Sequence, residues 1–177
     1  TTRVTGSDKT PEQMANIERY RHIWEPRGVH VHYCLEQFLL GDAQPNPKEY
    51  KDWVDPLLSD PFWNNFETWA VEYMIADLDK SVGGQFDVLG YDHNEGKLLL
   101  IDLKTQSKSN KKTYNTDAQL GSYVEALANH HQIVVDACKT IWSRPNKCII
   151  GEDQDPLTCR LAWHESWEKF DSQQNPF

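Results

Sequence analysis

The stretch GQFDVLGYDHNEGKLLLIDLKT (residues 84–105) is the most informative part of the chain, because it holds two strand-like segments joined by a polar turn. Leu98–Leu103 is mostly apolar, as in a buried central strand, and the turn His93–Gly96 ends on a glycine. Upstream, Val82–Leu89 and Trp69–Ile75 are rich in β-branched and aromatic residues, with the polar turn Asp77–Ser81 between them. We therefore expect a three-stranded antiparallel meander over residues 69–104.

Charged side chains stand at the end of the central strand. Asp102 and Lys104 project on the same side of it, and Asp87 on the preceding strand can meet Asp102 across the hairpin. Two converging carboxylates repel each other unless a divalent cation lies between them, and Mg²⁺ and Mn²⁺ bind such ligands. A nearby lysine can orient a water molecule and offset negative charge. These groups suit phosphodiester hydrolysis; the structural alternative is an exposed ion pair between Asp102 and Lys104.

The segments that flank this meander are expected to be largely helical. Proline and glycine signals, together with apolar spacing, mark where the elements begin and end. The expected helices are one from Pro11 after Thr10, one from near Gly28 to Gly41–Asp42, one over 48–58, one from Thr116 to Ala128, and one starting at Asp155–Pro156. Residues 132–151 are ambiguous, with strand-like segments at Ile133–Val135, Thr140–Trp142 and Cys148–Ile150. We expect one α/β domain over 1–177, with a helical N-terminal part (11–58), a core (69–151) and a C-terminal helix (155–172).

Composition excludes several classes of protein. The chain has 177 residues, 38% of them hydrophobic and 25% charged, which excludes disordered and low-complexity proteins. Its short apolar runs predict no transmembrane helix, and we expect that a secretion signal is either absent or was removed together with the initiator Met. The net charge of −9 means that nucleic-acid binding would need local patches or metal ions. The cysteines (Cys34, Cys138, Cys148 and Cys159) lack the close pairs of a zinc site, so we expect reduced thiols in a cytoplasmic protein.

Two pairs of residues lie four apart on expected helices. Gln119 and Tyr123 share one helical face, and so do His32 and Glu36. A core tyrosine with a flanking amide, and a structural histidine, are the ordinary interpretations. A neutral imidazole can, however, complete a Mn²⁺ or Mg²⁺ shell beside acidic ligands.

Together these residues resemble the PD-(D/E)XK nuclease superfamily, in particular its RecB-like branch. Four motifs occur in order, and four in order are far more specific than one. They are Gly28–Val29–His30–Val31–His32–Tyr33–Cys34–Leu35–Glu36, similar to G-x-x-x-H-x-x-x-E; Gly84–Gln85–Phe86–Asp87; Ile101–Asp102–Leu103–Lys104–Thr105, similar to D-x-K-T; and Gln119–Leu120–Gly121–Ser122–Tyr123, similar to Q-x-x-x-Y. The short chain is most similar to exonucleases related to mitochondrial genome-maintenance exonuclease and to phage relatives. His30 competes for the role of motif histidine, but the motif offset favours His32.

The resemblance implies a central mixed sheet flanked by helices, and it assigns roles to particular residues. Lys104 would position the attacking water, and Gln119 and Tyr123 would line the site. The metal, Mg²⁺ or Mn²⁺, would bind His32, Asp87, Asp102 and the backbone carbonyl of Leu103, with Glu36 as a further candidate. Some relatives carry an iron–sulfur cluster, but the late cysteines are too widely spaced, so none is expected here.

The expected function is a metal-dependent DNA exonuclease that acts on single strands or DNA ends in repair, recombination or phage DNA processing. A helicase or recombinase is a possible partner, in a bacterial or phage-infected cell. The alternatives are an endonuclease on the same core and a non-catalytic nucleic-acid-binding module. Phosphate contacts are expected from Lys108, Lys111, Lys112 and Arg144. Glu72, on the strand before Asp87, either approaches the site or is an exposed strand residue, and the second interpretation is favoured. The other acid-x-Lys match, Glu49–Tyr50–Lys51, is interpreted as a chance match on a helix.

Overall fold

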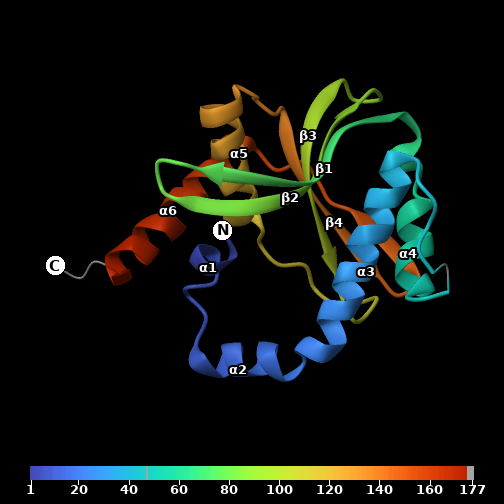
Figure 1. Cartoon of the computed structure of the whole chain (residues 1–177), viewed down its shortest axis with the longest axis horizontal. Helices are drawn as coiled ribbons and strands as arrows, with labels where there is room; N and C mark the ends of the chain where they lie inside the picture. The colour runs from blue at the N-terminus through green and yellow to red at the C-terminus, as the bar shows by residue number, and fades with distance from the viewer. Residues whose placement is uncertain (47, 175–177) are drawn as a thin grey trace.

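The computed structural model describes residues 1–46 and 48–174. Its centre is a five-stranded sheet in the order β1-β2-β3-β4-β5. The strands are β1 (Phe66–Asp77), β2 (Val82–Asp92), β3 (Lys97–Thr105), β4 (Ala137–Arg144) and β5 (Lys147–Ile150). β1, β2 and β3 form an antiparallel meander, β3 and β4 are parallel, and β4 and β5 are antiparallel. The predicted meander and the mixed sheet are confirmed (Figure 1).

Helices cover both faces of this sheet (Figure 1). One face packs against α3 (Arg21–Leu40) and α4 (Lys51–Leu58), and the other against α5 (Asp117–His131) and α6 (Pro156–Gln174). Alternate residues of β3 serve the two cores: Leu98 and Leu100 join the core of α5 and α6, whereas Leu99 and Ile101 join that of α3 and α4. Burial on both faces explains why the central strand is so apolar.

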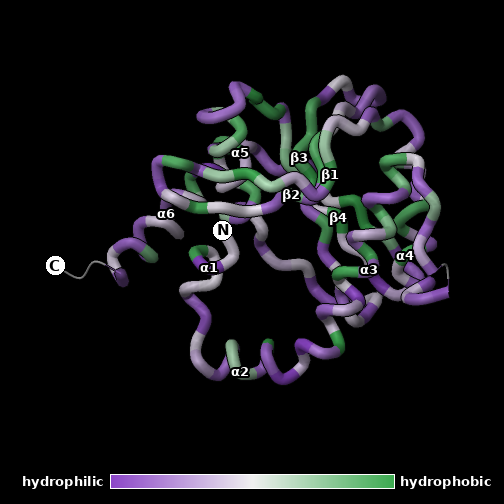
Figure 2. Tube along the Cα trace, in the orientation of Figure 1, coloured by the Kyte–Doolittle hydropathy of each residue, from purple (hydrophilic) through white to green (hydrophobic). Residues whose placement is uncertain are grey.

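Three short elements complete the chain: α1 (Thr2–Thr5), α2 (Pro11–Arg19) and a 3₁₀ helix, η1 (Pro61–Asn65). Thr10 caps α2 with a reciprocal capping box, as its sequence predicts. α2 buries none of its residues, and it lies away from the sheet at the bottom of Figure 1. Because α2 does not pack against the sheet, it forms an exposed connection between α1 and α3, here called the arch. The tube in Figure 2 shows this segment as largely hydrophilic.

The third helix starts earlier than expected. α3 begins at Arg21 and continues through Pro26 and Gly28, so the predicted start near Gly28 is wrong. Proline and glycine favour helix ends, but burial of Val31 and Leu35 against the sheet stabilises the long helix. Within the described residues, no helix combines the length and the apolar character needed to cross a membrane.

The segment between α5 and β4 also differs from the expectation. Ile133–Val135 belongs to no strand, although Val135 is buried in the core. Its β-branched residues satisfy the apolar requirement without backbone pairing, and the strand starts only at Ala137. The expected strands at Thr140–Trp142 and Cys148–Ile150 fall within β4 and β5, and the remaining helices lie near their predicted positions.

Candidate active site

Three acidic residues form one row across neighbouring strands. The β2–β3 ladder ends at the pair Val88–Ile101, and one step farther the register places Asp87 opposite Asp102. The β1–β2 ladder pairs Val71 with Val88 and Tyr73 with Phe86, which places Glu72 opposite Asp87. Residues opposite each other on adjacent strands have neighbouring side chains. The meander therefore gathers three carboxylates at one point.

The backbone pairing of β2 and β3 ends at this row, and the side chain of Asp87 replaces the next backbone acceptor. The backbone N–H of Leu103 donates to the Asp87 carboxylate. Burial alone would raise the pKa of Asp87, but His32, then Lys104 and this hydrogen bond, lower it on balance. Asp87 is consequently held ionised and in a fixed orientation at the point where the strands part.

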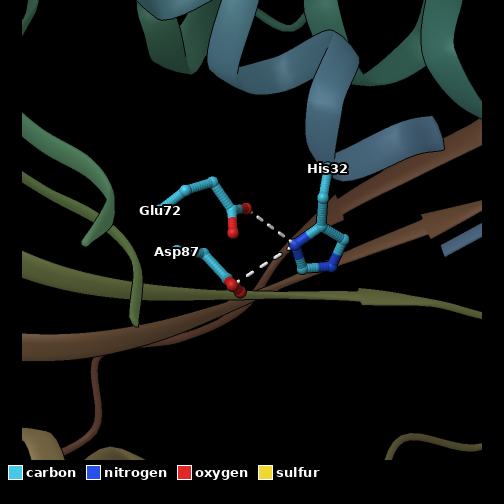
Figure 3. Close-up of side chains that lie close together, drawn as sticks. All are labelled: His32, Glu72 and Asp87. Carbon is cyan, nitrogen blue, oxygen red and sulfur yellow. Dashed lines mark hydrogen bonds and ion pairs between the residues drawn. The ribbon is translucent and has the colours of Figure 1, made fainter. Parts of the chain in front are cut away.

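His32 reaches the row from α3. Its Nδ1 lies 3.0 Å from Glu72 Oε1 and 3.3 Å from Asp87 Oδ1 (Figure 3). Burial alone would lower the pKa of His32, but Asp87 and Glu72 raise it to about 10. The imidazolium therefore acts as the cation between these carboxylates. The rival histidine, His30, instead packs against the ring of Tyr50, with centroids 5.6 Å apart.

The lysine of the motif is fixed between two partners. Lys104 Nζ donates to Asp102 Oδ1 and to Gln119 Oε1, both at 2.9 Å. The Gln119 amide in turn contacts the Tyr123 hydroxyl at 3.4 Å. The structure thus brings together Asp102, Lys104, Gln119 and Tyr123, which come from β3 and α5.

Burial and charge set the protonation of this second group. Burial raises the pKa of Asp102 to about 6, and repulsion from Asp87 adds to this, while Lys104 opposes it. Burial would lower the pKa of Lys104, but Asp102 and Asp87 raise it on balance, so the ammonium stays charged. Burial also raises the pKa of Tyr123 to about 12, which keeps the phenol neutral at physiological pH.

The donor set fits a divalent cation. One ligand atom from each of His32, Glu72 and Asp87 lies within 4.8 Å of the other two. Asp102 Oδ2 is buried at the same row, where it lies 2.8 Å from Lys104 Nζ without forming a well-aligned hydrogen bond, so a carboxylate oxygen here is available to a cation. Several carboxylate oxygens with one imidazole suit Mn²⁺ or Mg²⁺. The metal would replace the His32 proton, because only a neutral imidazole ligates.

Glu72 belongs to the site, although the sequence interpretation favours an exposed strand position for it. Its φ of 46° lies in the left-handed region, which an L-residue adopts at a cost of about 1–2 kcal/mol. Gln85 Nε2 holds its other oxygen, Oε2, at 2.6 Å. The length of the β1–β2 turn could have revealed this position. The sequence places Asp77 in the turn, whereas in the structure Asp77 pairs with Val82. A turn longer by that one residue would place Val71, and not Glu72, opposite Asp87.

Other predicted residues lie near the site without joining this cluster. Glu36 lines a groove beside His32, and the metal roles of Glu36 and of the Leu103 carbonyl stay predictions. Lys108, Lys111 and Lys112, here called the loop lysines, are exposed on the segment after β3. Arg144 is buried and holds the base of that segment, donating to Gln106 Oε1 at 2.7 Å and to the Ser109 carbonyl at 3.1 Å. Its guanidinium therefore orders the loop that displays the lysines.

Comparison with known proteins gives one family. The sequence profile of the PD-(D/E)XK nuclease superfamily matches residues 58–147. No curated protein matches the chain. Among solved structures, the crystal structure of SSO0001 is similar over 85% of this chain and 69% of its own, with 16% identity and a TM-score of 0.36. SPO1766, a protein of unknown function from Silicibacter pomeroyi, covers 75% of this chain and 95% of its own, with 10% identity and a TM-score of 0.28. Likeness at this level does not indicate shared function.

Proposed function

Because the chain belongs to the PD-(D/E)XK nuclease superfamily, we propose that it is a divalent-metal-dependent deoxyribonuclease of the RecB-like branch that degrades DNA from single-stranded ends. The observation that carries the proposal is the joint placement of the carboxylate row, His32, Lys104 and Gln119. The cluster comes from three strands and two helices, and each of its members has a hydrogen-bonding or charged partner in the site.

His32, Asp87 and Asp102 would hold the metal, with Glu72 as a further ligand. Bound Mg²⁺ or Mn²⁺ supplies positive charge that stabilises the negative charge developing on the phosphate during in-line displacement. The chain contributes orientation and proton placement. The Leu103 N–H fixes one oxygen of Asp87 and leaves the other directed toward His32.

Lys104 is positioned to act on the attacking water or on a phosphate oxygen. An ammonium has three N–H donors. Asp102 Oδ1 and Gln119 accept two of them, and Asp102 Oδ2 also lies 2.8 Å from Nζ. A substrate oxygen would be the acceptor for the third. Since the pKa of Lys104 is raised, this residue donates a hydrogen bond and stabilises charge and does not take up a proton. Gln119, steadied by the Tyr123 hydroxyl, keeps the ammonium aimed at the site.

The arch favours an exonuclease over an endonuclease. α2 buries none of its residues and connects to α3, which carries His32. The Trp24 indole N–H donates to the Ile17 carbonyl at 3.0 Å and so joins the two helices. A strand that passes beneath a closed connection must enter by an end. The same arch would hinder access by a closed circle.

The test is cleavage of end-labelled linear single-stranded, linear double-stranded and circular DNA, with Mg²⁺, Mn²⁺ or EDTA. We expect metal-dependent loss of linear single strands and survival of circles. Lys104→Ala should abolish cleavage. Lys51→Ala, in the chance acid-x-Lys match, should retain it, because Lys51 is exposed and pairs only with Asp55 among the described residues.

Each other outcome points to a different function. Cleaved circles would indicate the endonuclease. Absence of cleavage on every DNA substrate, with Mn²⁺ still bound by the protein, would favour the non-catalytic module or a requirement for a partner such as a helicase. Preferential loss of RNA would replace deoxyribonuclease with ribonuclease.

A further inference from the structure

A groove of about 650 Å³ lies beside the carboxylate row, between α3 and the β1–β2 hairpin. Trp24, Gly28, His32 and Glu36 line it at intervals of four residues along one face of α3. Glu72 and Gln85 close the opposite side. His32 and Glu72 thus belong both to the groove and to the candidate active site, so the groove is continuous with the place where phosphate would be attacked.

Gly28 keeps the middle of this groove open. Glycine inside a helix is unfavourable relative to alanine, and packing does not require it here. A Cβ built at Gly28 meets nothing nearer than Thr105 Oγ1, at 3.8 Å. The missing side chain therefore leaves free space between Trp24 and His32.

The lining of the groove suits a flat, uncharged ring. Trp24 is 37% exposed and Tyr33 is 46% exposed, and the bond from the Trp24 indole to Ile17 holds that ring in place. Aromatic faces of this kind stack on nucleobases of any sequence. The acidic side chains Glu25, Glu36 and Glu72 also line the groove and would repel phosphates. The loop lysines, by contrast, follow Thr105, which lies against Gly28.

Resting on the proposed nuclease function, we propose that this groove takes one unpaired nucleobase of the strand being cut and stacks it on Trp24. The phosphates then run on the lysine side, and the scissile one lies at the carboxylate row. A base held in a duplex is already paired and stacked, so this contact selects single-stranded substrate.

The test measures binding of labelled single strands in which one abasic nucleotide is moved along the sequence. Lys104→Ala protein with Mn²⁺ is used so that the probe survives. At one position near the cut, the abasic probe should bind about 5- to 150-fold more weakly, because stacking contributes about 1–3 kcal/mol per base and 1.4 kcal/mol is tenfold. Adding Trp24→Ala should remove this position-specific loss. Adding Trp69→Ala should keep it, since Trp69 is exposed but lies outside the groove.

A second variant fills the groove without touching Trp24. Gly28→Leu should weaken binding of intact single strands and leave the thermal unfolding temperature at or above that of the parent. A flat abasic profile, a profile unchanged by Trp24→Ala, or equal binding of duplex and single strand would overturn the groove inference while wild-type cleavage still stands. Wild-type protein that neither binds nor cleaves single strands would overturn the proposed function, and the inference with it.

Discussion

The left-handed backbone at Glu72 predicts that this residue weakens the fold while it serves the site. Replacing Glu72 by Gly removes both the side chain and the backbone strain, whereas replacing it by Gln removes only the charge. An L-residue with φ near 46° costs about 1–2 kcal/mol. Relief of this strain stabilises the glycine variant, but about 0.5–1 kcal/mol of that stabilisation is lost, because glycine gives the unfolded chain more conformational freedom. Glu72→Gly should therefore be about 1 kcal/mol more stable than Glu72→Gln.

Thermal unfolding of metal-free protein measures this difference. For a domain of this length, about 1 kcal/mol corresponds to about 2–4 °C. Mn²⁺ titration calorimetry on the same two variants should show a loss of affinity of about tenfold or more in both, because each lacks the carboxylate. Ser81 provides the control, since its φ is 53° and it lies in the β1–β2 turn: Ser81→Gly should gain stability and retain metal affinity. If Glu72→Gly is no more stable than Glu72→Gln, the backbone at this position stores no strain and the reasoning is wrong.

Four further predictions concern charged residues. The pKa of His32 rises from 6.5 to about 10 on folding. In metal-free protein the ion pairs of His32 with Glu72 and Asp87 therefore stabilise the fold fully below pH 6.5, and their contribution disappears as the pH rises toward 10. Urea unfolding across that range should show the decline in stability, and His32→Gln should flatten the pH dependence. Because Mn²⁺ must displace that proton, its affinity should rise about tenfold per pH unit near neutrality, and calorimetry that detects no proton release would contradict this. Changing the three loop lysines to alanine should reduce the slope of log K against log salt for single strands by about 2, at about 0.7 per phosphate contact, whereas Lys51→Ala should leave the slope unchanged. Arg144→Ala should cost about 1–3 kcal/mol by leaving the side-chain oxygen Oε1 of Gln106 unpaired, and it should speed proteolysis of residues 106–112. Equal protease resistance would refute the role of Arg144 in ordering that loop.

Much of the candidate site could be predicted because its geometry is local. Alternation along one strand is sufficient to place Lys104 beside Asp102, and helical spacing is sufficient to place Gln119 near Tyr123. The hairpin turn His93–Gly96 correctly pairs Asp87 with the Asp102 position. Each of these inferences needs only the period of a strand or helix, or the length of one short turn.

The remaining features depend on contacts between distant segments. The position of His32 beside Glu72 joins residues 40 positions apart, and it requires α3 to cross the sheet at one particular angle. The early start of α3 and the absence of a strand at Ile133–Val135 follow from burial that outweighs local preference. The sequence predicts that Arg144 contacts DNA, whereas in the structure its side chain is buried and donates a hydrogen bond to Gln106.

The order of the strands in the meander and the residue types that the chemistry needs can be predicted from the sequence, because periodicity and turn length are properties of a continuous chain. The place of Glu72 in the carboxylate row, and of Trp24 and Gly28 along a groove leading from it, emerges only from the folded chain. Those placements depend on a one-residue register and on the packing of a helix against a sheet. Both are set by the summed burial of many side chains far apart in sequence, so no local pattern records them.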